Sequence, residues 1–136
     1  MINPNKALWE KGDFTRIAAA MRDSGDELVE SLGVAPGMDV LDLGCGDGTT
    51  ALPAAKRGAN VLGVDIAANL VAAGNARATA AGLHNLRFQE GDASDLRGSR
   101  GDGPRAPTRM IAHGSSRSWA HWRSTSSIRR LFRQSR

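Results

Sequence analysis

The chain has 136 residues, a net charge of +4 and a single cysteine. This length allows one domain at most, and one cysteine excludes an internal disulfide and a cysteine-cluster metal site. Charged residues spread through the first twenty positions exclude a signal peptide, and no apolar run approaches a membrane span, so a cytoplasmic protein without a membrane partner is expected.

The first predicted element is a helix from Phe14 to Leu32, after a polar leader at Met1–Gly12. Asp13 can cap this helix, its apolar residues recur at helical spacing, and Gly33 supplies the stop. The Ser24-Gly25 pair is the point at which we expect an interruption of the helix.

The central part of the chain alternates short apolar strands with helices. Strand–helix alternation over short connections predicts right-handed crossovers and a parallel sheet. The expected fold is the N-terminal half of a doubly wound, Rossmann-like α/β sheet with three strands and flanking helices. The strands are expected at Met38–Leu43, Asn60–Asp65 and Asn85–Gln89, and the helices at Thr49–Arg57 and Ala67–Ala81.

The composition changes abruptly at Arg97. Residues 1–96 carry a net charge of −5, whereas residues 97–136 carry +9, with ten arginines, eight serines and no periodic apolar pattern. High charge with low hydrophobicity is typical of disorder. We therefore divide the chain into a partial α/β domain at residues 1–96 and a disordered Arg/Ser-rich tail at residues 97–136.

A glycine-rich turn follows the first predicted strand, in the segment V-L-D-L-G-C-G-D-G-T-T at Val40–Thr50. Glycines allow positive φ and a close ligand approach, and the next helix directs free N–H groups to the same place. The spacing is G-x-G-x-G, with Thr49 in place of the third glycine of a dinucleotide fingerprint and without a Walker lysine. The turn therefore predicts a nucleotide site that binds neither a dinucleotide nor a triphosphate. A purely structural turn is the alternative.

Two aspartates follow the other predicted strands. Asp65 can accept hydrogen bonds from both ribose hydroxyls, although strand-end aspartates also cap helices or are simply solvated. Asp92, in the sequence Gly91-Asp92-Ala93, can accept from the exocyclic amine of a purine, although aspartates are also common in turns. Ligands of open α/β sheets bind where parallel strands end, so the three features together favour an adenosyl ligand.

These segments resemble the first three motifs of class I S-adenosylmethionine-dependent methyltransferases, in order and in spacing. The matching stretches read V-L-D-L-G-C-G-D-G, V-L-G-V-D-I and F-Q-E-G-D-A, and they are most similar to a small-molecule group that includes quinone-biosynthesis enzymes. The resemblance implies S-adenosylmethionine as cofactor and a small-molecule methyl acceptor. By the resemblance, the methionine end is held by Asp42, Gly44, Cys45, Gly46 and Gly48, the ribose by Asp65, and the adenine by Ile66, Asp92 and Ala93.

The leader W-E-K-G-D-F also resembles a segment that closes over the cofactor in some of these enzymes. By this resemblance Trp9, Phe14 and Thr15 are lid contacts. Ordinary hydrophobic anchoring is the alternative interpretation.

The resemblance ends at residue 96, where family members continue with a fourth strand and a substrate-facing loop. Residues 97–136 contain no such pattern, so we expect a frameshift or truncation near codon 97, a hypothesis contradicted if neither other reading frame restores a fourth strand. Without that strand, Val40–Leu43 would be an aggregation-prone edge strand. The acceptor site would also be lost, so we expect weak or absent catalysis and identify no catalytic residue.

Two other functions compete with this interpretation. Trp119 and Trp122 lie among arginines and can stack on bases, which would make the chain a nucleotide-binding module with a basic nucleic-acid arm. A shifted reading frame explains the same residues with fewer assumptions, so a nucleic-acid partner is disfavoured. An NAD-binding oxidoreductase is disfavoured by the missing third glycine. The three histidines are scattered, and no metal site is predicted.

Overall fold

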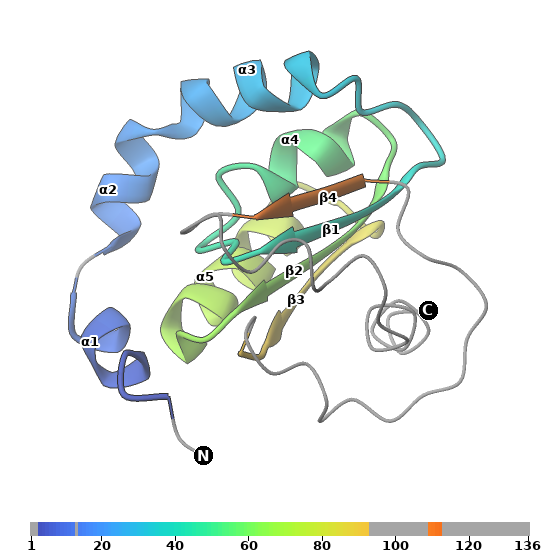
Figure 1. Cartoon of the computed structure of the whole chain (residues 1–136). Coiled ribbons are helices and arrows are strands. Elements are labelled where there is room, and N and C mark those ends of the chain that lie inside the picture. Colours follow the sequence, from blue (N-terminus) through green and yellow to red (C-terminus); the bar gives the residue numbers. More distant parts are fainter. Residues whose placement is uncertain (1–2, 13, 93–108, 113–136) are drawn as a thin grey trace, which may run out of the picture.

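The computed structural model describes residues 3–12, 14–92 and 109–112 of the chain. A parallel sheet lies at the centre, α4 and α5 pack on it, and α1, α2 and α3 follow one another in an arc around this α/β core (Figure 1). The strands are β1 (Asp39–Leu43), β2 (Asn60–Asp65), β3 (Leu86–Glu90) and β4 (Arg109–Ala112). The helices are α1 (Lys6–Lys11), α2 (Phe14–Ala20), α3 (Arg22–Ser31), α4 (Ala51–Lys56) and α5 (Ala68–Ala80).

The strand order is β3-β2-β1-β4, and every pair is parallel. In the central pair, Asp39 lies opposite Asn60 and Leu43 opposite Val64. All five positions of β1 are buried, as expected for a strand with neighbours on both sides and covered faces. The predicted Rossmann-like fold, with three parallel strands and flanking helices, is confirmed.

A fourth strand, β4, comes from the stretch that the sequence predicts to be disordered. It pairs with β1 from Val40↔Arg109 to Leu43↔Ala112, and the Ile111 side chain is 5% exposed within the core. The expectation of an edge strand at Val40–Leu43 is therefore wrong, as is the expectation of disorder at residues 109–112. The four residues of β4 are too few to show a strand-like pattern in an arginine-rich sequence. They form a strand because the main chain of β1 offers hydrogen-bond partners along its edge. The rest of the predicted tail lies outside the described residues.

The N-terminal helices also differ from the prediction. The supposed polar leader contains α1, and the single helix expected from Phe14 to Leu32 is divided into α2 and α3 at Met21, whose φ and ψ are −101° and 5°. The interruption expected at Ser24-Gly25 is wrong, because both residues lie inside α3. None of the helices in the described ranges is long and apolar enough to cross a membrane.

Phe88 joins three elements of the core. Its side chain, 3% exposed, lies against glycines of the turn, of β2 and of α5. A Cβ atom at Gly63 or Gly74 would lie 2.8 Å from the ring, and one at Gly48 would lie 2.7 Å from Cζ. The three glycines therefore leave the space that the aromatic ring of β3 fills.

Candidate functional site

A cavity of about 790 Å³ lies where β1, β2 and β3 end. This volume is within the range of small-molecule sites, and the place is the one at which open parallel sheets bind ligands. The sequence-predicted residues that line it are Gly44, Cys45, Gly46, Asp65, Ile66 and Asp92. The structure thus brings together residues from all three predicted motifs.

The other predicted residues are placed differently. Asp42 is fully buried in β1, and it is not among the residues that line the cavity. Gly48, the last residue of the turn, lies against the core side chains of Leu52 and Phe88. Ala93 lies outside the described residues.

The glycine-rich turn owes its shape to positive φ angles, as the sequence predicts. The φ values are 70° at Gly44, 56° at Gly46 and 99° at Gly48, a region that side chains disfavour. The N–H groups of Gly44 and Cys45 both donate to the carbonyl oxygen of Val64, at 2.8 and 3.2 Å, and so tie the turn to β2. A Cβ at Gly46 would meet no atom within 4 Å, so a ligand can approach the backbone there.

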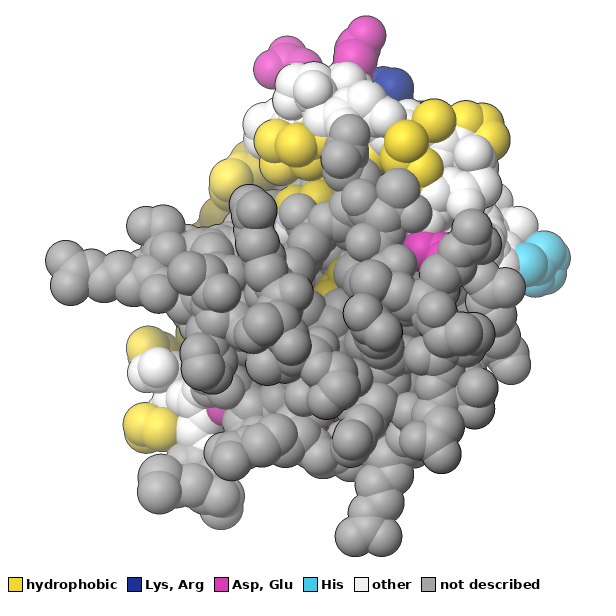
Figure 2. Space-filling view, turned by 45° about the vertical axis from the view of Figure 1, so that its right-hand side comes forward, with side chains coloured by type: hydrophobic (Ala, Val, Ile, Leu, Met, Phe, Trp, Pro, Cys, Tyr) yellow, Lys and Arg dark blue, Asp and Glu magenta, His cyan; other side chains and the backbone are white. Residues whose placement is uncertain are grey.

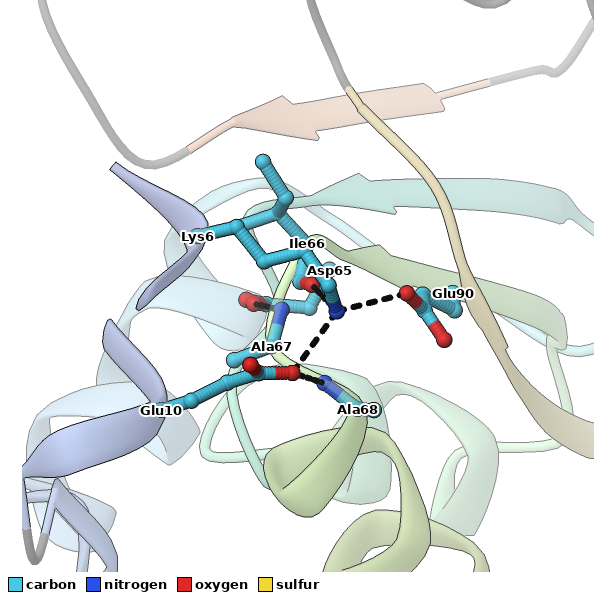
Figure 3. Close-up of polar contacts among 7 residues, drawn as sticks. All are labelled: Lys6, Glu10, Asp65, Ile66, Ala67, Ala68 and Glu90. Atoms are coloured by element: carbon cyan, nitrogen blue, oxygen red, sulfur yellow. Dashed lines mark hydrogen bonds and ion pairs between the residues drawn. The ribbon is translucent and has the colours of Figure 1, made fainter. Parts of the chain in front are cut away.

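The Asp65 carboxylate is fixed by two main-chain donors, of which Figure 3 shows the one from Ala67. Its Oδ2 accepts from the Gly46 N–H at 2.8 Å, and its Oδ1 accepts from the Ala67 N–H at 2.9 Å, just before α5. Each carboxylate oxygen can accept a further hydrogen bond, and Asp65 lines the cavity. The carboxylate therefore orients the turn and still has acceptor capacity for a diol.

Asp92 has a partner that sequence patterns do not reveal. Asn3 Nδ2 donates to Asp92 Oδ2 at 2.9 Å, and both residues line the cavity. The two positions are 89 residues apart, so no local motif could have indicated the contact. Asn3 adds an amide group to the end of the cavity formed by β3.

Lys6 attaches α1 to the ends of β2 and β3 (Figure 3). Its Nζ lies 2.7 Å from Glu10 Oε1 and 2.7 Å from Glu90 Oε1, and it donates to the carbonyl oxygen of Ile66 at 3.1 Å. Hydrogen bonds to Glu10 and Glu90 raise the pKa of Lys6, and the bond from Lys6 lowers the pKa of Glu10. The N-terminal helix thus forms a wall beside the strand ends.

The N-terminal helices give the cavity an apolar wall. Trp9, expected as a lid contact, lines the cavity, whereas the side chains of Phe14 and Thr15 lie outside the described part of the chain. Exposed hydrophobic side chains are visible on the described surface (Figure 2). The exposed large hydrophobic residues that line the cavity are Trp9, Ile17, Met21 and Leu28, whose exposed fractions lie between 37% and 58%.

Replacing Gly25 by alanine is expected to destabilise the fold. An added Cβ would lie 2.1 Å from the Thr49 carbonyl oxygen, where α3 packs on the turn. Alanine gains about 1 kcal/mol of helix propensity over glycine, but overpacking against backbone costs about 1–3 kcal/mol. We expect a net loss of about 1 kcal/mol in urea unfolding. Asp26→Ala, on the exposed side of the same helix, should not destabilise; equal behaviour of both variants would contradict the close contact.

The Cys45 thiol is expected to react slowly in the folded protein. Burial raises the pKa of this thiol well above its ordinary value, and the nearby carboxylates of Asp42 and Asp65 raise it further. Each unit of pKa lowers the thiolate fraction at pH 8 about tenfold. Iodoacetamide labelling followed by mass spectrometry should therefore be at least about tenfold slower in buffer than in urea. Equal rates in the two solutions would show an accessible thiolate instead.

No group of three or more potential metal-ligating side chains is found in the described residues. The chemistry of the cavity is that of backbone N–H groups, carboxylates and an apolar wall. Such a set suits an uncharged or cationic nucleoside derivative better than a triphosphate.

Comparisons of the sequence and of the structure with known proteins agree on one family. A family model described as a methyltransferase domain matches residues 40–133. Rv1405c of Mycobacterium tuberculosis is 40% identical over 93 residues, which cover 68% of this chain and 34% of that protein. The 23S rRNA (uracil(1939)-C(5))-methyltransferase RlmD of Alkalilimnicola ehrlichii is 44% identical over 85 residues, covering 62% and 19%. This chain therefore spans about a third, or less, of the length of such curated relatives.

Solved structures agree with this result. Magnesium protoporphyrin IX methyltransferase (ChlM) from Synechocystis, crystallised with bound SAM, superposes with a TM-score of 0.52 at 28% identity. The superposition covers 72% of this chain and 45% of that enzyme. With a family model that covers more than half of its length, this chain belongs to the methyltransferase-domain family, the class I S-adenosylmethionine-dependent type that its motifs resemble.

Proposed function

We propose that this chain binds S-adenosylmethionine in the cavity at the strand ends, as the donor-binding part of a methyltransferase. The observation that carries the proposal is the Asp65 carboxylate, which is held by the Gly46 N–H at 2.8 Å and faces the cavity. This residue would accept from the ribose hydroxyls, and the open backbone at Gly46 would receive the methionine end. When bound, the donor supplies a methyl group activated by its sulfonium.

The remaining donor contacts follow from the same placement. Asp92, with Ala93, would accept from the adenine amine, and Ile66 would pack on the base. The Gly44, Cys45 and Gly48 backbone would shape the turn around the methionine end. Because Asp42 is fully buried in β1, two residues before Gly44, its proposed role is to support the methionine end of the site without lining the cavity.

A small, apolar molecule is our proposed methyl acceptor. Support comes from the wall of Trp9, Ile17, Met21 and Leu28, which lines the same cavity as the polar strand ends. ChlM is named for a small-molecule substrate and RlmD for a 23S rRNA. RNA recognition needs a basic surface, whereas residues 1–96, which include the residues lining the cavity, carry a net charge of −5; the basic excess of the chain lies in residues 97–136. The charge around the cavity therefore favours a small molecule over RNA.

We further propose that the 136-residue chain transfers methyl groups weakly or not at all. Among the described residues that line the cavity, no histidine, lysine or tyrosine is available as a general base. Methyl transfer also requires a bound acceptor held in line with the sulfonium. Residues 1–96 would then be the donor-binding unit, joined by β4 in the sheet. The family match runs beyond this boundary, to residue 133, and translation of the other two reading frames tests the boundary.

Isothermal titration of the full chain with S-adenosylhomocysteine and, separately, with NAD tests the donor proposal. We expect saturable one-to-one binding of S-adenosylhomocysteine and no heat of binding with NAD, because the turn lacks the third glycine of a dinucleotide site. Binding of NAD alone would favour the oxidoreductase interpretation. Binding of neither ligand would contradict the proposed function.

A further inference from the structure

Asp47, in the second half of the turn at Gly44–Gly48, carries a carboxylate with no exposed surface. Arg77 of α5 places Nη1 3.2 Å from Asp47 Oδ1, and the same nitrogen donates to the Asp47 carbonyl oxygen at 2.8 Å. Arg22 of α3 places Nη2 3.7 Å from Oδ2. A buried carboxylate needs compensating charge, and these guanidinium groups supply it from two helices.

The turn needs such an anchor because of its glycines. Three residues with positive φ give the segment a large conformational freedom when it is not held from outside. Its first half is held by β2, through bonds to the Val64 carbonyl oxygen and to the Asp65 carboxylate. Arg77 contacts the second half, at both the side chain and the main chain of Asp47.

We propose that Arg77 is a positioning residue for the methyl donor, acting through Asp47, and that Arg22 links the same carboxylate to α3. Arg77 is not among the residues that line the cavity, so its effect would pass through the turn. A displaced turn would move the Gly46 N–H away from Asp65, and the ribose acceptor would lose its orientation. The inference rests on the proposed donor binding.

The test is titration of the full chain and its variants with S-adenosylhomocysteine, combined with thermal unfolding. We expect Arg77→Met to raise Kd about tenfold, the loss of one charge-assisted contact. Arg77→Lys keeps the charge but loses the planar fork, and should raise Kd about threefold. Arg57→Met removes an arginine at the end of α4, near the start of β2, and should leave Kd unchanged.

A double-mutant cycle separates positioning through Asp47 from packing of the Arg77 side chain. In an Asp47→Asn background, the additional effect of Arg77→Met on Kd should fall below about threefold, because the ion pair is gone and only the uncharged bond to the Asp47 carbonyl oxygen remains. An undiminished tenfold effect in that background would overturn the inference, as would a folded Arg77→Lys variant with wild-type Kd. If Arg77→Met does not fold, the Arg77→Lys result decides. Failure of the wild-type chain to bind would instead contradict the proposed function.

Discussion

Replacing Asp65 by alanine is expected to weaken binding of S-adenosylhomocysteine about a hundredfold. The proposed ribose contact consists of two hydrogen bonds to an ionised acceptor, each with a net contribution of about 1.5 kcal/mol. Since about 1.4 kcal/mol corresponds to a tenfold change in affinity, the two together give about two orders of magnitude. The variant also frees the N–H groups of Gly46 and Ala67 and should lose about 1 kcal/mol of stability.

Titration calorimetry measures the affinity, and circular dichroism during heating verifies that the variant is folded. Glu30→Ala is the matched control, because it removes a carboxylate whose side chain is 77% exposed on α3. Wild-type affinity in a folded Asp65→Ala protein would exclude Asp65 as the ribose acceptor. A similar loss in both variants would point to a general effect of charge.

Replacing Phe88 by alanine is expected to remove about 3–5 kcal/mol of stability, a large part of the total for a domain of this size. The ring fills space bounded by glycines of the turn, β2 and α5. Glycines have no side chains that could move into the cavity left by the ring. The surrounding structure would therefore fill little of that cavity. The turn at Gly48 should also lose its support.

Urea unfolding followed by circular dichroism gives the free energy of unfolding from the midpoint and slope. Phe88→Leu retains part of the volume and should cost less than Phe88→Ala. Leu8→Ala serves as the control, because this side chain is 64% exposed and its loss should change stability by less than about 0.5 kcal/mol. Equal effects of Phe88→Ala and Leu8→Ala would show that the ring is not a core element.

Local patterns in the sequence predicted the central part of the molecule. The three strands and the positive φ of Gly44, Gly46 and Gly48 follow from apolar runs and glycine spacing, which depend on neighbouring residues alone. The placement of Asp65 and Asp92 in one cavity follows from the rule that parallel strands end at one edge of the sheet. The family identification depended on the same three segments.

Other features depend on contacts between distant parts of the chain, and the tertiary structure alone decided them. β4 has little strand signal of its own and is defined by its pairing with the main chain of β1. Asn3 meets Asp92 across 89 residues, and Arg77 meets Asp47 across 30. The buried charge of Asp47, unlike the glycines on either side of it, has meaning only when α3 and α5 bring their arginines to the turn. Sequence thus determined what each segment could form by itself, and packing determined which segments hold one another in place.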